Sequence, residues 1–182
     1  SALGVVTQRW GLANQNAITL PDHLFRAGEL ADTPPIMNNG PTILWFRSDL
    51  RLSDNPALLH AARHGAPVLP IFILDEGGDR RPPGGASRWW LHHSLQALAA
   101  ALAGLGLRLH VFRGDPAVLI PDLVRLTGAG LVVWNRRYGA EERALDTAIK
   151  AELKTQGIAA ESFNSHLLRE PWQVSGGTGQ PY

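Results

Sequence analysis

From Thr42 onward, short apolar runs alternate with longer stretches in which apolar residues recur every three or four positions. This alternation is typical of βαβ units built on a parallel sheet. Five runs are predicted as strands: residues 42–46, 68–74, 107–112, 131–135 and 159–163. Each is almost continuously apolar, as expected for strands covered on both faces. We therefore predict an α/β fold, a doubly wound Rossmann-like five-stranded parallel sheet flanked by helices, with strand order 3-2-1-4-5.

Two helices are predicted in the first half of this region. One begins at Asn55-Pro56 and ends near Gly65. Proline at the first helical position loses no hydrogen bond, and Asp54 or Asn55 can cap the helix. The other begins at Ser87 and places five leucines on one stripe at steps of three and four: Leu91, Leu95, Leu98, Leu102 and Leu105. Such a stripe predicts a helix that packs on the sheet along one face.

Two more helices are predicted further along the chain. Asp115-Pro116 repeats the pattern of a capping residue followed by proline, and Pro121 is expected to kink that helix or delay its start. The last helix begins near Glu141 and stops at Gly157, because glycine readily takes the left-handed conformation that ends a helix. Beyond the fifth strand we expect only irregular chain.

Residues 1–41 differ from the rest of the chain. They show no clear period and contain the breaker-rich run 32–35, which precedes Met37, the only methionine. Residues 1–41 are interpreted as an N-terminal extension or an expression-derived arm, with Met37 as the native start; a genuine arm packed on the domain is the alternative. Residues 42–182 form the predicted α/β domain.

Composition and charge exclude several classes of function. The absence of cysteine excludes disulfides, thiolate nucleophiles and cysteine-based zinc sites. The net charge is only +1 and the cations are scattered, so tight autonomous binding to DNA is not indicated. No apolar run reaches the roughly 18 residues that span a bilayer, and no cationic start leads into an apolar signal segment. We expect a soluble, cytoplasmic protein without a membrane partner.

Common catalytic and metal-binding motifs are missing from the sequence. The first strand is followed by Arg47-Ser48-Asp49 and not by G-x-G-x-x-G, and no G-x-x-x-x-G-K-[ST] loop is found. His92 and His93 are adjacent on a helix with no third ligand at a suitable spacing, which favours structural or surface histidines. No serine stands in a G-x-S-x-G elbow. The sequence therefore predicts no catalytic residue and no metal site.

The end of the first strand carries alternating charges. Arg47, Asp49 and Arg51 follow the strand at the carboxyl edge of the predicted sheet, where they can pair with one another and fix the loop. A structural ion-pair network is favoured for them over direct contact with a ligand, because charge networks commonly have structural roles.

Residues 45–58, with the sequence WFRSDLRLSDNPAL, resemble the opening of the DNA photolyase/cryptochrome family. Further segments resemble the same family in the same order: 87–95, 114–116, 134–138 with 142–143, 167–172 and 179–182. The resemblance covers about residues 42–182. It marks Arg47, Asp49, Arg51, Asp54 and Asn55 as a structural family motif.

The resemblance implies the N-terminal domain of a blue-light-dependent DNA photolyase, a deoxyribodipyrimidine photolyase, which binds an antenna chromophore. In that family FAD, the electron-transfer tryptophans and the lesion pocket belong to a helical domain that follows. The full-length enzyme would pass an electron from reduced flavin to a pyrimidine dimer flipped out of the duplex. The implied partners are that helical FAD domain and, through it, damaged DNA, so this fragment alone is expected to be inactive and to bind no FAD.

Glu141 and Glu142 occupy the positions of a polar pair that contacts the pterin in folate-type photolyases. The first of the pair is usually Asn, so Glu142 matches and Glu141 departs. A carboxylate can accept two parallel N–H bonds from the amino-pyrimidine edge of a pterin. The alternative role of Glu142 is to complement the positive N-terminus of a helix, which stabilises it by about 0.3–1 kcal/mol.

Phe72 and Arg88 match positions that line the antenna pocket in deazaflavin-type relatives, although a core position is favoured for Phe72. Arg137 and Gly139 stand where those relatives carry acidic residues. Methenyltetrahydrofolate is therefore favoured over deazaflavin as the antenna chromophore.

Two other readings remain open. A cryptochrome photoreceptor would contain the same domain, and a stand-alone nucleotide-binding α/β protein would need a phosphate loop that the sequence lacks. Trp89 and Trp90 are expected to pack, because the electron-relay tryptophans of the family lie in the helical domain.

Overall fold

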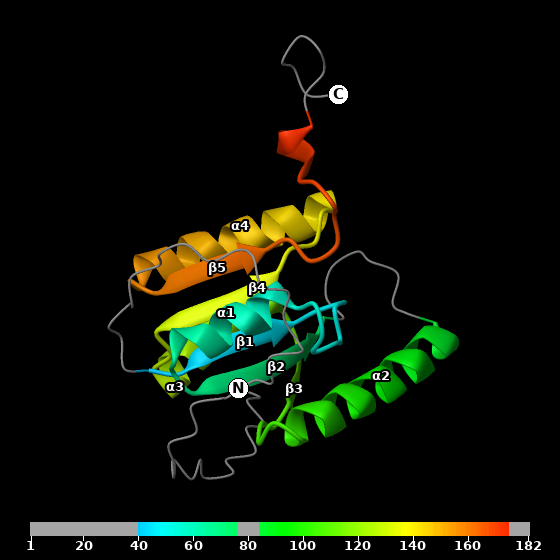
Figure 1. Ribbon diagram of the computed structural model, residues 1–182. Helices are drawn as coiled ribbons and strands as arrows, with labels where there is room; N and C mark the ends of the chain where they lie inside the picture. Colours follow the sequence, from blue (N-terminus) through cyan, green and yellow to red (C-terminus); the bar gives the residue numbers. More distant parts are fainter. Residues whose placement is uncertain (1–39, 76–83, 175–182) are drawn as a thin grey trace.

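The computed structural model describes residues 40–75 and 84–174 as one layered α/β domain (Figure 1). Along the chain, the elements are β1 (Thr42–Phe46), α1 (Pro56–His64), β2 (Val68–Leu74), α2 (Gly85–Ala103), β3 (His110–Arg113), α3 (Pro116–Thr127), β4 (Leu131–Asn135), α4 (Ala140–Thr155), β5 (Ala159–Phe163) and the short 3-10 helix η2 (Pro171–Gln173). Residues 1–39 of the predicted extension lie outside the described residues, so both interpretations of it stay predictions.

The five strands form one parallel sheet in the order β3-β2-β1-β4-β5. The predicted fold and strand order are confirmed. β1 is central and pairs with both β2 and β4, and all five of its residues are buried. Of those five, Ile43 and Trp45 pack with side chains of α3 and α4, while Leu44 and Phe46 pack with side chains of α1 and α2. The strands are apolar on both faces because helices cover both.

The predicted helix starts are confirmed where a capping residue precedes proline. The Asn55 side chain accepts a hydrogen bond from the Leu58 N–H at 3.1 Å, and Asp115 accepts one from the Ala117 N–H at 2.8 Å. Pro121 does not delay the start of α3, because the helix runs from Pro116 through Pro121 to Thr127; the expected kink stays a prediction. Pro121 is buried beside the core, and the burial of the surrounding apolar side chains outweighs the single hydrogen bond that proline cannot make.

Two boundaries and one packing stripe differ from expectation. β3 begins at His110 and not at Leu107, because Leu107 donates its N–H to the Leu102 carbonyl and so belongs to the turn that closes α2. α2 begins at Gly85, two residues before the predicted start. Of the five leucines of the predicted stripe, only Leu98 and Leu102 are buried, and Leu105 lies beyond the end of α2 at Ala103. A short helix, η2, also follows β5 where only irregular chain was expected.

Across the described residues, no helix has both the length and the apolar character needed to cross a bilayer. The same part of the chain contains no group of three or more histidine, cysteine or acidic side chains placed to hold a metal ion.

Candidate functional site

The strand order changes direction between β1 and β4, which are neighbours in the sheet although they are far apart in sequence. The loop after β1 leads to α1 on one face, and the loop after β4 leads to α4 on the other face. In open α/β sheets the crevice outside the carboxyl ends of strands at such a point is where ligands bind. The candidate site is therefore expected at this edge of the sheet.

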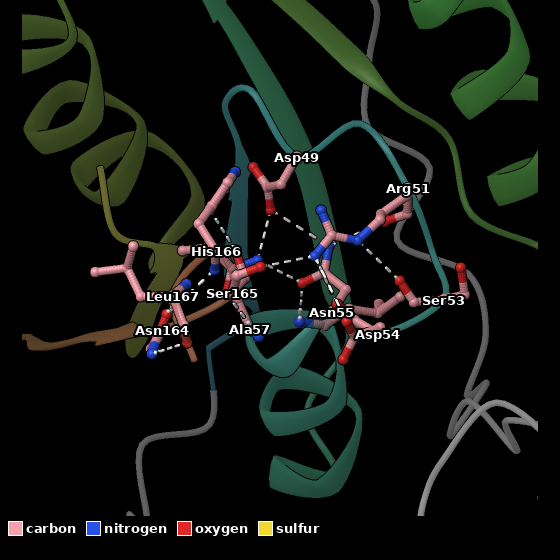
Figure 2. A network of polar contacts seen from close by, with 12 residues as sticks. Asp49, Arg51, Ser53, Asp54, Asn55, Ala57, Asn164, Ser165, His166 and Leu167 are labelled. Atoms are coloured by element: carbon pink, nitrogen blue, oxygen red, sulfur yellow. Dashed lines mark hydrogen bonds and ion pairs between the residues drawn. The ribbon is translucent and has the colours of Figure 1, made fainter. Parts of the chain in front are cut away.

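A buried polar network holds the two loops together at this point (Figure 2). Asp49 accepts hydrogen bonds from the Arg47 backbone N–H at 3.1 Å and from the side-chain amides of Asn55 and Asn135. Asn135 also donates to the Asn55 Oδ1 at 2.8 Å and accepts from the Ala57 N–H at 3.2 Å. Asp49, Asn55 and Asn135 are each almost fully buried. The start of α1 is thus fixed to the end of β4 through side chains.

Arg47 forms a buried ion pair with a residue of α4. Its Nη1 donates to the Asp146 Oδ1 at 2.7 Å, and Asp146 also accepts from the Trp134 indole N–H at 2.9 Å. The guanidinium carbon lies 4.4 Å from the centre of the Trp45 ring. Burial lowers the pKa of Arg47 from its ordinary value, and the nearby Asp146 carboxylate opposes that shift. The pair connects β1 to α4.

Arg51 connects the loop after β1 to the segment after β5 (Figure 2). It donates from Nε to the Ser53 carbonyl at 3.2 Å and from Nη2 to the carbonyls of Asp54 and Ser165, at 3.0 Å and 2.9 Å. The hydrogen bonds of Arg47, Asp49 and Arg51 are thus to other groups of the protein, as a structural network requires. Direct contact of these three side chains with a ligand stays the less favoured alternative.

A groove of about 690 Å³ opens between this charged loop and the start of α2. Its volume falls in the range of roughly 300–1,000 Å³ found for small-molecule sites. The groove combines an indole ring, apolar side chains, hydroxyl groups and two arginines, and is lined by Arg47, Ser48, Asp49, Leu50, Arg51, Ala86, Ser87, Trp90, Leu91 and Ser94. Trp90 and the three serines were not predicted as site residues, because the loop and the helix meet only in the folded chain.

The predicted pterin-contacting pair lies at the start of α4. The Glu142 side chain is 18% exposed, and its Oε1 lies 3.6 Å from the Arg137 Nη2. Its carboxylate folds back over Gly139, where a Cβ would collide with Oε2. This position complements the helix N-terminus, and it also places Glu142 within electrostatic reach of Arg47. Glu141 is exposed in the first turn.

Phe72 and Arg88 lie apart from this pair. Phe72 is buried near the end of β2, opposite Phe46 of β1, which agrees with the favoured core position. Arg88 is exposed in the first turn of α2, next to the groove-lining Ser87. The structure thus brings Arg47, Arg137 and Glu142 together, and places neither Phe72 nor Arg88 in the lining of the groove. Ligand roles for Glu141, Glu142, Phe72 and Arg88 stay predictions.

Comparison with known proteins shows the family to which the chain belongs. The sequence profile described as DNA photolyase matches residues 42–182. The chain belongs to the DNA photolyase family. It is 47% identical over 146 residues to a deoxyribodipyrimidine photo-lyase of Agrobacterium fabrum, covering 80% of this chain and 30% of that protein. It is 41% identical over 143 residues to cryptochrome-2 of Arabidopsis thaliana, covering 78% of this chain and 23% of that protein.

Solved photolyase structures share the fold. A bacterial class III photolyase from Agrobacterium tumefaciens matches with a TM-score of 0.72 and 44% identity, over 86% of this chain and 30% of that one. An archaeal photolyase from Sulfolobus tokodaii, which contains two FAD molecules, matches with a TM-score of 0.65 and 25% identity, over 75% and 32%. The chain thus spans about a third of the length of these photolyases, and is similar to their N-terminal part. Photolyases use FAD and antenna chromophores.

A second polar cluster in this photolyase-family domain was missed by the sequence analysis. The Arg136 Nη2 lies 3.0 Å from the Oε1 of Glu170, whose side chain is buried, and the Arg136 guanidinium carbon lies 5.5 Å from the centre of the Trp172 ring. Burial first, and then the neighbouring Glu170 carboxylate, raise the pKa of Tyr138 to about 12. These residues join the end of β4 to η2, so they fix the direction in which the chain leaves the sheet.

This shift predicts a dependence of stability on alkaline pH. Tyr138 keeps its proton in the folded protein to about pH 12, whereas an ordinary tyrosine loses it near pH 10. The contribution of Tyr138 to stability is therefore fully present below pH 10 and lost as the pH rises through about 12. In a Tyr182→Phe background, absorbance titration of the remaining tyrosine should show a midpoint near 12. A midpoint near 10 contradicts the described cluster, and Tyr138→Phe should abolish the titration altogether.

Proposed function

We propose that this chain is the antenna-chromophore-binding domain of a blue-light-dependent DNA photolyase whose full-length form repairs pyrimidine dimers. The observation that carries the proposal is the 47% identity to a deoxyribodipyrimidine photo-lyase, together with the groove that opens at the carboxyl edge of the sheet. The partners are a C-terminal helical FAD domain of the same polypeptide and, through that domain, damaged DNA. The domain by itself is inactive and binds no FAD.

The groove is the proposed binding site of the antenna chromophore. An indole face such as that of Trp90 suits a flat conjugated ring, and the partly exposed guanidinium of Arg51 suits a ligand with carboxylates. Methenyltetrahydrofolate has both features. It is favoured over a deazaflavin because Glu142 matches the folate-type pair and because Arg137 and Gly139 stand where deazaflavin-type relatives carry acidic residues. Arg47 lines the groove and interacts with Glu142 across the end of β1, so the two parts of the site are electrostatically connected. The residues present fit a folate.

The proposed pterin contact predicts an effect of Glu142→Gln on chromophore binding by the full-length protein. Removing the charge from a carboxylate that accepts hydrogen bonds weakens binding by about 1.5–3 kcal/mol, or roughly 10- to 100-fold. The dissociation constant of methenyltetrahydrofolate, from equilibrium titration of chromophore-depleted protein, is the measurement. The neighbouring variant Glu141→Gln is the matched control and should change the constant less than about threefold. Equal effects of both variants contradict the contact.

Repair assays test the proposed function. Under blue light, the full-length protein with reduced FAD should split pyrimidine dimers in DNA, whereas the 1–182 chain should purify without the absorbance of a flavin and leave dimers intact. Stoichiometric FAD in the 1–182 chain, or repair by it, contradicts this division between domains.

We also propose a cytoplasmic location, which cell fractionation tests directly; recovery of the protein in the membrane fraction contradicts it.

A cryptochrome photoreceptor is the second candidate. It is favoured by the 41% identity to cryptochrome-2 of Arabidopsis thaliana, which is close to the identity found with the photo-lyase. The same repair assay separates the two, because a full-length protein that binds FAD and responds to blue light without splitting dimers is the cryptochrome outcome.

A further inference from the structure

A second groove lies between α3 and α4, on the face of the sheet opposite α1 and α2, and we name it the α3–α4 groove. It has a volume of about 840 Å³ and shares no lining residue with the groove at the carboxyl edge. Its walls are mainly apolar and come from both helices, the turn after α3 and the residue before β5: Ala117, Val118, Pro121, Ala129, Ala148 and Ile158. The domain therefore has an apolar groove that the proposed chromophore site does not use.

The charged side chains of the α3–α4 groove are engaged with its other polar side chains. Arg125 is paired with Asp122 of the same helix. Glu152 accepts a hydrogen bond from the Gln156 side-chain amide at 2.9 Å. By contrast, the apolar Val118 in the wall is 57% exposed. An apolar peptide segment suits such a groove better than a charged small molecule, because the charged ligand would compete with these existing pairs.

The chain enters the domain beside this groove. The Pro41 carbonyl accepts a hydrogen bond from the Gly130 N–H at 3.1 Å, and a Cβ at Gly40 would collide with the Gly128 carbonyl. Gly128 and its neighbour Ala129 belong to the groove lining. The residues that precede Gly40 in the sequence therefore need no long connection to reach the groove.

The sequence just before this entry point is suited to an apolar groove. Residues 30–37, LADTPPIM, include the apolar Leu30, Ile36 and Met37 and a single charge, Asp32. Pro34-Pro35 favour the extended polyproline II conformation, so binding costs this segment little conformational entropy. At about 3.1 Å per residue the segment spans about 25 Å, whereas α3, with 12 residues, is about 18 Å long. The segment is thus long enough to follow the groove along the helix.

We propose that residues 30–37 occupy the α3–α4 groove of the same chain. The short tether 38–39 gives the segment an effective concentration of about 1 mM, so an intrinsic dissociation constant of about 0.1 mM fills the groove in about nine molecules of ten. The inference takes the second interpretation of residues 1–41, that of a genuine arm packed on the domain. It goes beyond the proposed function and does not depend on it, because the groove and the segment both lie within residues 1–182.

The course of the chain favours this occupant over two others. Polypeptide that follows β5 starts from the carboxyl edge of the parallel sheet, whereas Gly40 precedes β1 at the opposite edge, beside the groove. A second copy of the chain would lack the advantage of the tether.

Thiol labelling tests the occupant of the groove. The chain contains no cysteine, so Ala148→Cys introduces a single thiol in the groove wall. This thiol should react with a maleimide at least about tenfold faster in a 37–182 chain than in the 1–182 chain, as measured by mass spectrometry. Ala151→Cys, at an exposed position of α4 outside the groove lining, is the matched control and should react equally fast in both chains. Equal rates for the Ala148→Cys thiol in the two chains overturn the proposal and favour the expression-derived interpretation of residues 1–41.

A substitution within the arm gives a second measurement at unchanged chain length. In the Ala148→Cys background, Ile36→Asp should raise the labelling rate of the 1–182 chain about tenfold, because a carboxylate is costly to bury against apolar walls. Asn38→Asp adds the same charge in the tether and should change the rate less than about twofold. An Ile36→Asp chain that labels as slowly as its parent contradicts the proposal.

The same thiol distinguishes the other occupants. Labelling of the 1–182 chain that slows as the protein concentration rises would assign the groove to a second copy. Slow labelling that is found only in the full-length protein would assign it to polypeptide that follows residue 182. Either result overturns the proposal, whereas equally slow labelling of the 1–182 chain and the full-length protein at every concentration supports it.

Discussion

Replacing Asp146 with alanine is expected to lower the free energy of unfolding by about 3–5 kcal/mol. Asp146 is the partner of the buried Arg47 guanidinium at 2.7 Å and of the Trp134 indole N–H at 2.9 Å. The substitution leaves a cation inside the protein without its counter-charge, and an indole donor without its acceptor. Urea unfolding of the purified 1–182 chain, followed by circular dichroism, measures the change.

The matched control for Asp146→Ala removes both charges. The double variant Arg47→Met/Asp146→Leu fills the site with apolar side chains of similar size. It should lose only about 1–3 kcal/mol, because no unpaired charge is buried and only the Trp134 indole N–H lacks its acceptor. If Asp146→Ala lost less than about 1 kcal/mol, the buried pair would not be the connection between β1 and α4 that the structure describes. The double variant also distinguishes a structural role of Arg47 from a role in ligand binding. A domain that stays stable but no longer binds the chromophore would show that Arg47 contributes to chromophore binding.

Replacing Asp49 with alanine is expected to lower the free energy of unfolding by about 3 kcal/mol or more. Asp49 accepts hydrogen bonds from the Arg47 backbone and from the amides of Asn55 and Asn135, all in the buried junction between β1 and β4. Each donor left without an acceptor in the interior costs about 1–3 kcal/mol, and the capping position of Asn55 at α1 is held by the same contacts. Urea unfolding of the 1–182 chain gives the value.

The control for Asp49 is an acidic residue in the same loop. The Asp54 side chain is 93% exposed and lies 3.9 Å from the Arg51 Nη2, so the contribution of this pair is small. Asp54 has a φ of 49°, a conformation that asparagine tolerates well, so the suitable variant is Asp54→Asn. It should change the unfolding free energy by less than about 0.5 kcal/mol. Similar losses for Asp49→Ala and Asp54→Asn contradict the buried network.

Much of the fold was predictable because its signals are local. Four strands begin and end at the predicted residues, since a strand covered on both faces reads as a continuous apolar run. β3 was misplaced because Leu107 is as apolar as a strand residue, while its N–H closes the turn after α2. A delayed start of α3 at Pro121 was wrongly allowed for, because a propensity rule takes no account of packing, and α3 begins at Pro116 and includes the buried Pro121.

The candidate site was predictable only in part. The motif after β1 identified Arg47, Asp49 and Asn55, but their partners Asn135 and Asp146 are 86 and 99 residues away from the groups they bind, and no local pattern connects them. Trp89 and Trp90 were expected to pack, but they are 60% and 69% exposed. The burial of an aromatic side chain depends on which elements pack against its helix, and the local sequence does not show this. Local patterns fix the elements, whereas long-range contacts and the rest of the protein decide what each side chain does.

The action spectrum of repair by the full-length protein tests the central claim most directly. If this domain holds an antenna chromophore for a flavin elsewhere in the protein, the rate of dimer splitting per incident photon should follow the absorption of the bound chromophore. Depleting the chromophore should remove that band and leave a weaker band that follows reduced FAD. An action spectrum that matches the flavin alone in chromophore-loaded protein, or the absence of repair at every wavelength, would contradict the account.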